Sequence, residues 1–226
     1  MTKVCILDYG SGNVGSVNNL IQFLNYECKI SNDPKEIEKS THIILPGVGA
    51  FGPAMQKVKN KIPIKKLENE ILKKNKPFLG ICVGMQLMAT TGEEFGEFEG
   101  LGWIEGRVKK MKSKILPHIG WNDITIKKDS KIFSGLNEHK DFYFVHSFHF
   151  DLKDKNLVVA ETEYGEKFCS IFQKENIIGA IAGGILGMII WLLSKEPYTS
   201  VGIWQLIFVL VCAWGGIYTF GPFIKK

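Results

Sequence analysis

The first hundred residues repeat one pattern: a short apolar run, a glycine-rich turn, and then apolar residues at helical spacing. Short apolar runs predict strands that are buried on both faces, and intervals of three or four predict amphipathic helices. Their alternation predicts an α/β fold with a mostly parallel sheet flanked by helices, which binds ligands at the carboxyl ends of its strands. The predicted strands are 4–7, 43–45 and 77–81, and the predicted helices carry Val17, Leu20, Ile21 and Leu24, then Ile64, Leu67, Ile71 and Leu72, then Met85, Leu87 and Met88.

The pattern changes from Gly102 onward, where the apolar segments are shorter and no helical spacing follows them. Segments of this kind, separated by turn residues, are typical of short strands. We expect strands over 103–111, 123–126, 142–150, 157–162 and 167–173.

The last 50 residues are almost free of charge. The protein has 28 basic and 23 acidic residues, but only four of them lie beyond position 176: Lys195, Glu196, Lys225 and Lys226. The uncharged stretches are 177–194 and 198–224. A bilayer core requires about 20 apolar residues, so the second stretch is long enough and the first is borderline.

This composition break predicts a domain over 1–176 and a hydrophobic tail over 177–226 that forms a two-helix transmembrane hairpin. The domain would then be cytoplasmic and tethered to the inner face of the cell membrane, with the terminal lysines on the same side. The alternative is that the tail supplies a buried strand and helix to a soluble domain.

Cysteine usage and charge exclude several other classes. The five cysteines are scattered and never spaced as CxxC, which argues against a disulfide framework and against a cysteine zinc site. The net charge of +5 comes from lysines that are spread along the chain. We interpret them as a solvated surface rather than a nucleic-acid patch. No metal or organic cofactor is predicted.

The candidate chemistry lies at Cys82. Gly80-Ile81-Cys82-Val83-Gly84 joins a predicted strand to a predicted helix, and G-x-C-x-G at such a junction is the cysteine form of a nucleophile elbow. A helix N-terminus favours the thiolate, so we expect a lowered thiol pKa. The alternative is a small buried core cysteine.

A cysteine that attacks an amide carbonyl also needs donors for the oxyanion. Val83 directly follows Cys82, and its N–H is one candidate. The turn after the second predicted strand offers a second donor from Val48 or Gly49. The alternative is an ordinary strand-to-helix turn.

Five motifs together resemble a known family. GICVGMQLM, with LPGVGAFG upstream and DYGSGNVGSV at the start, is similar to the class I glutamine amidotransferases. LPHIGWN and DFYFVHSF narrow the resemblance to the glutaminase subunits of imidazole glycerol phosphate synthase, which act in histidine biosynthesis. The resemblance extends from Met1 to about Gly179. It implies a glutaminase that hydrolyses glutamine to glutamate and ammonia, and a heterodimer with a cyclase subunit that uses the ammonia.

The resemblance also implies roles for particular residues. Cys82 would attack the side-chain amide of glutamine, and Gln86 would help to hold this substrate. The glutamine pocket would be lined, chiefly by backbone groups, by His146, Ser147 and Phe148. The cyclase would be contacted by Asn13, Pro117, His118, Gly120, Trp121 and Asn122.

The family pattern fails where the general base is expected. A thiol nucleophile usually has a base held by a third group, and in the family these are the His and Glu of a Q-F-H-P-E segment on the last strand. This chain instead continues after Gly179 with AIAGG, and no histidine lies beyond His149. We therefore expect impaired catalysis. In one structural alternative, 177–181 still pairs as that last strand.

Three interpretations remain open. The first is an impaired glutaminase subunit of the histidine pathway, or of a related amidotransferase for surface-polysaccharide sugars. The second is a non-catalytic interaction module tethered to a membrane by its tail. The third is a chimera, in which an unrelated tail was joined after Gly179.

Overall fold

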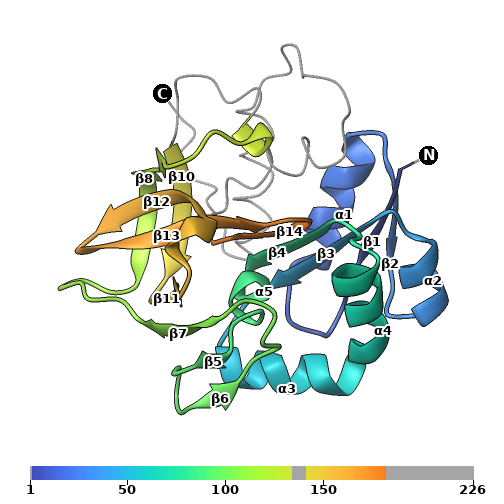
Figure 1. Cartoon of the computed structure of the whole chain (residues 1–226), viewed down its shortest axis with the longest axis horizontal. Helices are drawn as coiled ribbons and strands as arrows, with labels where there is room; N and C mark the ends of the chain where they lie inside the picture. Colours follow the sequence, from blue (N-terminus) through green and yellow to red (C-terminus); the bar gives the residue numbers. More distant parts are fainter. Residues whose placement is uncertain (1, 134–140, 182–226) are drawn as a thin grey trace, which may run out of the picture.

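A central eight-stranded sheet organises the computed structural model, which describes residues 2–133 and 141–181 (Figure 1). The strand order is β2-β1-β3-β4-β14-β13-β12-β9. The four pairings from β2 through β1, β3 and β4 to β14 are parallel, and the three pairings from β14 through β13 and β12 to β9 are antiparallel. The prediction of a mostly parallel α/β sheet is confirmed. The strands are β1 Lys3–Ile6, β2 Glu27–Ile30, β3 His42–Gly47, β4 Phe78–Cys82, β9 Thr125–Ile126, β12 Val158–Tyr164, β13 Glu166–Lys174 and β14 Ile177–Ala180.

The central parallel strands are apolar on both faces because helices cover the sheet. β1 and β3 bury all but their first residue, and β4 buries its first three residues. The helices are α1 Val14–Phe23, α2 Pro34–Lys39, α3 Phe51–Lys61, α4 Ile64–Glu68, continued by the π-helical turn η1 Asn69–Lys73, and α5 Val83–Gln86. α5 is a single turn, shorter than the predicted helix through Met88.

Two smaller sheets complete the structure. One pairs β8 (His118–Asp123) with β10 (Asp141–His146), and the other has the order β11-β7-β5-β6. The predicted strand over 142–150 is therefore two strands in different sheets, separated by Ser147. The remaining elements are β5 Thr91–Gly92, β6 Phe98–Glu99, β7 Gly106–Lys110, β11 Phe148–Leu152 and the 3₁₀ turns η2 Lys131–Phe133 and η3 Lys155–Leu157.

The beginning of the predicted tail belongs to the sheet. Ile177–Ala180 form β14, between β4 and β13, so a membrane helix that starts at Ile177 does not fit the structure. β14 is therefore an interior strand of the sheet, and all four of its residues are buried. The rest of the predicted hairpin, from 182 onward, lies outside the described residues. Among the helices of residues 2–133 and 141–181, none is long and apolar enough to cross a membrane.

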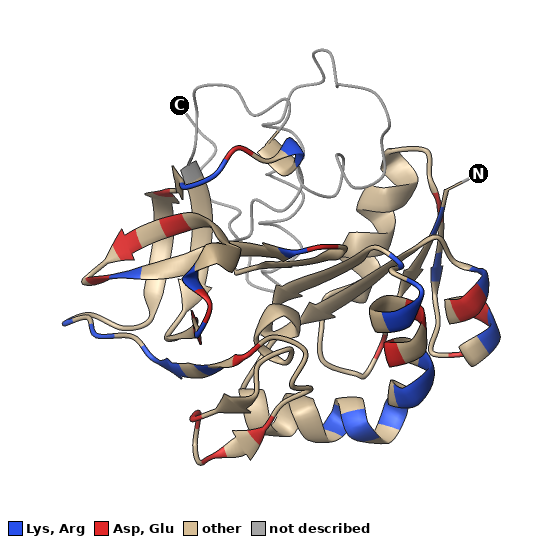
Figure 2. Cartoon of the chain, in the orientation of Figure 1, with Lys and Arg blue, Asp and Glu red and all other residues tan. Residues whose placement is uncertain are grey.

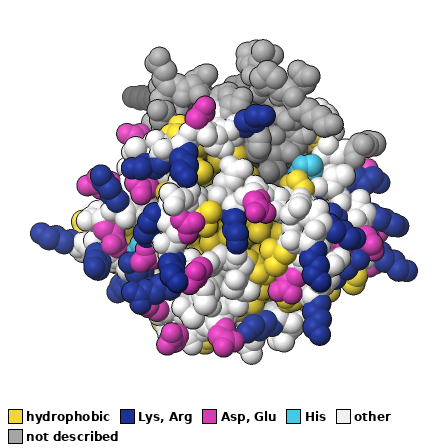
Figure 3. Space-filling view, in the orientation of Figure 1, with side chains coloured by type: hydrophobic (Ala, Val, Ile, Leu, Met, Phe, Trp, Pro, Cys, Tyr) yellow, Lys and Arg dark blue, Asp and Glu magenta, His cyan; other side chains and the backbone are white. Residues whose placement is uncertain are grey.

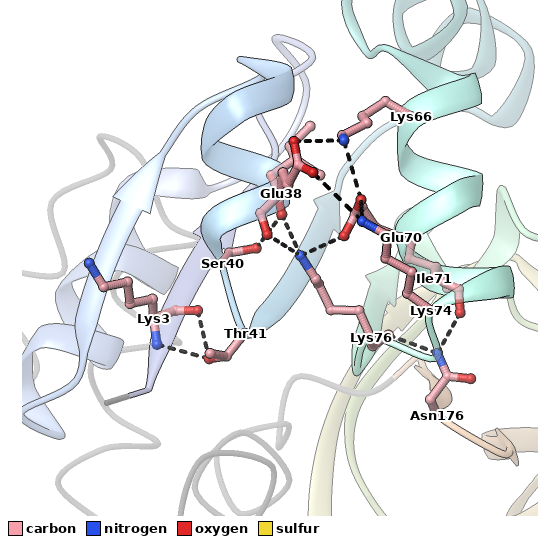
Figure 4. Close-up of polar contacts among 11 residues, drawn as sticks. Lys3, Glu38, Ser40, Thr41, Lys66, Glu70, Ile71, Lys74, Lys76 and Asn176 are labelled. Carbon is pink, nitrogen blue, oxygen red and sulfur yellow. Dashed lines mark hydrogen bonds and ion pairs between the residues drawn. The ribbon is translucent and has the colours of Figure 1, made fainter.

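A buried carboxylate holds the segment that leads into β4 (Figure 4). Glu70 is 1% exposed and pairs with the ammonium groups of Lys66, Lys74 and Lys76 at 2.8 to 3.3 Å. The Asn176 side-chain amide donates to the carbonyls of Ile71 and Lys76 at 2.9 and 2.7 Å. The entrances to β4 and β14 are therefore fixed to the same turn.

Charged side chains of both signs are spread over the surface. Lysines line the outward side of α3, and acidic and basic residues alternate on α2 and α4 (Figure 2). In the space-filling view, lysines and acidic residues intermingle with apolar surface between them (Figure 3). Charges of both signs are mixed on this face, and the interpretation of the lysines as a solvated surface stays a prediction.

Candidate active site

Cys82 lies at a strained strand-to-helix turn. It is the last residue of β4, with φ +54° and ψ −114°, and α5 begins at the next residue. A positive φ is costly for a side chain with a Cβ, and strained residues of this kind cluster at functional sites. The predicted elbow is therefore present in the backbone, and Cys82 taken as a whole residue is half-buried.

Glycines allow the elbow to approach the end of β3. A Cβ on Gly84 would overlap the carbonyl oxygen of Leu45. A Cβ on Gly47 would lie 2.5 Å from the Gly84 nitrogen and 2.6 Å from the Tyr9 hydroxyl. Backbone at this distance admits no side chain. The fit is therefore between main chains and requires glycine at both positions.

The three candidate oxyanion donors lie around this contact. Gly47, the last residue of β3, pairs in register with Cys82, so Val48 and Gly49 continue past the cysteine. Gly49 is exposed and has φ +95°, which favours glycine. Val83 is the first residue of α5. Val83 is thus adjacent to Cys82 in sequence, and Val48 and Gly49 directly follow the residue that pairs with Cys82 in the sheet.

The environment of Cys82 opposes ionisation. The pKa of the thiol is raised to about 11: burial is the main cause, the charge of Glu94 adds to it, and the Val83 N–H acts in the opposite direction. The expectation of a lowered pKa from the helix N-terminus is wrong here. α5 has only four residues, and its one stabilising N–H is outweighed by loss of solvation.

Two residues near Cys82 were not among the candidate site residues of the sequence analysis. The Glu94 carboxylate accepts a hydrogen bond from the Phe51 N–H at 2.9 Å, and burial raises its pKa. Tyr9 is 1% exposed, and its hydroxyl has no hydrogen-bond partner among the described residues. Burial, and then the charge of Cys82, raises the pKa of Tyr9. Tertiary packing alone brings both residues to the elbow.

The candidate substrate-binding residues meet at one carbonyl group. The buried Gln86 side chain donates to the Phe148 carbonyl oxygen at 3.1 Å. His146 Nδ1 lies 3.0 Å from the same oxygen. Ser147, between them, accepts from the Met111 N–H through its own carbonyl. The backbone group on which these candidate residues converge is therefore the Phe148 carbonyl.

The candidate partner-facing residues divide into two sets. Trp121 is 50% exposed, Pro117 is exposed, and Gly120 is part of the same strand region. His118 differs, because its side chain is 2% exposed and packs inward between aromatic rings. Asn122 is half-buried and hydrogen-bonds to His118. Asn13 caps α1, where its side chain accepts from the Ser16 N–H at 3.2 Å.

On the side of β4 opposite to β3, strand β14 stays paired with β4 up to the residue before Cys82. Ala180 of β14 pairs with Ile81, and the Ile181 N–H donates to the Ser170 carbonyl. Residues from 182 onward, where the family has its His and Glu, lie outside the described residues. His139 lies in the undescribed segment 134–140. In the part of the chain that is described, no three His, Cys, Asp or Glu side chains form a metal-ligand group.

Comparison with known proteins agrees with this geometry. The model of the family "Glutamine amidotransferase class-I" matches residues 5–180, and the chain belongs to this family. It is 41% identical over 177 residues to imidazole glycerol phosphate synthase subunit HisH 1 of Campylobacter jejuni subsp. jejuni, with 77% of this chain and 88% of that protein covered. It is 43% identical over 180 residues to subunit HisH of Pyrococcus furiosus, with 79% and 89% covered.

Solved structures support the fold at lower identity. PurLQS from Thermotoga maritima superposes with a TM-score of 0.63 at 16% identity, covering 93% of this chain and 99% of that one. A glutamine amidotransferase from the same organism has a TM-score of 0.55 at 20% identity, with 84% and 80% covered. At these identities the likeness concerns the fold alone.

Proposed function

We propose that this chain is the glutaminase subunit of an imidazole glycerol phosphate synthase. It would supply ammonia to a cyclase subunit. The observation that carries the proposal is the register of Gly47 with Cys82, which joins a strained elbow to a turn of potential oxyanion donors. The relatives named as subunits of that synthase, at about 40% identity, support the assignment to this pathway.

The proposed chemistry has two steps. The Cys82 thiolate attacks the side-chain amide carbon of glutamine, and the N–H groups of Val83 and of Val48 or Gly49 stabilise the oxyanion. The carbon–nitrogen bond then breaks, and ammonia leaves with a proton from the medium. Water hydrolyses the resulting glutamyl thioester to glutamate and restores the thiol. The net reaction consumes glutamine and water and yields glutamate and ammonia.

Substrate recognition follows from charge. Free glutamine carries an α-ammonium group, and Glu94 is the carboxylate whose charge acts on Cys82. We assign Glu94 to the α-ammonium, and the Gln86 side-chain oxygen to a second polar group of the substrate. The Gln86 side-chain nitrogen already donates a hydrogen bond to the Phe148 carbonyl oxygen. On this assignment Trp121 and Pro117 contact the cyclase, whereas His118 does not reach it directly.

The raised thiol pKa and the missing histidine support a second candidate, a non-catalytic interaction module. Ammonia and glutamate release by the full chain, measured in mild detergent with a cyclase subunit present, separates the two. A rate above that of Cys82→Ala, increasing with pH, supports the glutaminase. A rate equal to that of Cys82→Ala at every pH overturns it and leaves the module.

The structure leaves less of the C-terminal tail available to cross a membrane than the sequence suggested. With Ile177–Ala180 in the sheet, the first uncharged stretch retains only 182–194, which is shorter than the roughly 20 residues that a span requires. We therefore propose a single membrane segment within 198–224. Flotation of the full chain with lipid vesicles, compared with a chain that ends at Ile181, tests this segment. Equal flotation of both would overturn it.

A further inference from the structure

Two buried histidines lie between β8 and the Phe148 carbonyl. His118 and His146 face each other across the β8–β10 pair, with His118 Nδ1 and His146 Nε2 3.2 Å apart. Their side chains are 2% and 8% exposed. The His118 ring is stacked between Phe144 and Tyr164, with centroids 4.9 and 3.9 Å away. Aromatic packing therefore fixes the plane of the ring.

The hydrogen-bond partners fix the protons on these rings. The Phe148 carbonyl can only accept, so His146 carries its proton on Nδ1 and offers Nε2 as an acceptor. His118 must then donate from Nδ1, which leaves its Nε2 to accept from the Asn122 amide at 3.3 Å. Each hydrogen bond in the series from Asn122 through His118 and His146 to the Phe148 carbonyl therefore has a defined donor and acceptor. Burial lowers the pKa of His146 to about 4 and also lowers that of His118, so both rings remain neutral near pH 7.

The inner end of this chain reaches the elbow. The Phe148 oxygen that accepts from His146 also accepts from the Gln86 side chain, four residues after Cys82. A carbonyl oxygen has two lone pairs, and these two donors use both. If the His146 donor is lost, the Phe148 carbonyl keeps only the Gln86 donor, and the contact that places the Gln86 amide is held less firmly.

We propose that His118 and His146 are positioning residues, which hold the Phe148 carbonyl and through it orient the Gln86 side chain toward the substrate. This inference rests on the proposed function, because it assigns Gln86 to glutamine. It gives His118 a role inside the domain in place of contact with the cyclase. His149, a third buried histidine, is not part of this hydrogen-bonded chain: its Nε2 lies 3.5 Å from a Glu166 carboxylate oxygen, and neither ring nitrogen forms a hydrogen bond within the described residues.

The experiment uses the full-length protein in mild detergent, with ¹⁵N-labelled histidine and glutamine side chains observed by NMR. We expect both His118 and His146 in the Nδ1–H form. In His118→Phe, which keeps the aromatic stack, His146 Nε2 loses its donor, and we expect the His146 Nε2 signal and the Gln86 amide signal to shift. His149→Phe is the matched control and should change neither signal. His118→Asn, which places an amide N–H near the former Nδ1, should restore the Gln86 signal.

Glutamine binding provides the functional readout. In a Cys82→Ala background, His118→Phe should weaken glutamine binding about fivefold, the equivalent of one hydrogen bond, while His149→Phe leaves it unchanged. An Nε2–H tautomer at either histidine, or an equal response of the Gln86 signal in both variants, overturns the proposal. If Cys82→Ala binds no glutamine but the Gln86 signal responds as expected, the positioning chain stands and the proposed function fails.

Discussion

Strand β4 has a different neighbour on each side of Cys82. On the β3 side, the contact is between main chains: Gly47 pairs with Cys82, and Gly84 lies against Leu45. On the β14 side, the register is equally regular up to Ala180, but the sequence beyond it offers no histidine. The backbone that positions the Cys82 nucleophile and the side chains that would transfer its protons are therefore specified by different parts of the sequence. Backbone register can persist where the side chain that performs acid–base work is absent.

The largest expected effect concerns proton chemistry at Cys82. With a thiol pKa of about 11, the thiolate fraction rises tenfold per pH unit below that value. Alkylation of Cys82 by iodoacetamide should therefore increase about 1,000-fold from pH 7 to pH 10 without a plateau. The rate is measured by mass spectrometry of the Cys82 peptide. A plateau near neutral pH would mean that some group replaces the missing base.

Gly84→Ala is the substitution that most directly disrupts the main-chain contact between β3 and the turn that carries Cys82. The added methyl group overlaps the Leu45 carbonyl, so we expect a loss of about 3 kcal/mol in the free energy of unfolding, or failure to fold. Gly15→Ala is the matched control, because a Cβ there meets nothing within 4 Å in α1. The control should stabilise by about 0.5 kcal/mol. Urea denaturation compares the two, and similar destabilisation by both would contradict the close contact.

Glu70→Gln tests the anchor that β4 and β14 share. Burial alone would raise the pKa of Glu70, but hydrogen bonds from Lys74 and Lys76 lower it to about 2, against an ordinary value of 4.5. The carboxylate therefore stabilises the fold above pH 4.5, and this contribution is lost as the pH falls toward 2. We expect Glu70→Gln to cost about 2 kcal/mol at pH 7 and to have little effect at pH 2.

The control for this prediction is Glu38→Gln. Glu38 belongs to the same cluster, but its side chain is 53% exposed, so its removal should cost far less than that of Glu70. Thermal unfolding followed by circular dichroism between pH 2 and pH 7 measures both variants. A loss for Glu70→Gln that does not depend on pH would exclude the ion-pair explanation.

The smallest expected effect is that of Tyr9→Phe. The Tyr9 hydroxyl is buried without a partner among the described residues, so its removal should stabilise the fold by up to about 1 kcal/mol. Tyr26→Phe, at a residue packed less deeply on the core, is a suitable control. Urea denaturation at pH 7 gives the result. Destabilisation by Tyr9→Phe would show that the hydroxyl has a partner in solution.

The sequence predicted those features that depend on local pattern. β1, β3 and β4 were predictable because strands buried on both faces are continuous apolar runs, and the elbow was predictable from G-x-C-x-G. β8 was missed because its pattern is inverted: His118 is buried while Ile119 and Trp121 are exposed. Glu94 and Tyr9 have no local signal, since only the packed fold brings them to Cys82.

The position of β14 has a consequence for protein engineering. Its last residue, Ala180, lies beside Ile81, one position before the nucleophile. Anything joined after it, whether a native segment, a recombined one or a designed cassette, starts its path at the reaction centre. Ala180 is therefore a natural splice point, where exchange of the downstream sequence can change the chemistry while the sheet upstream is left intact.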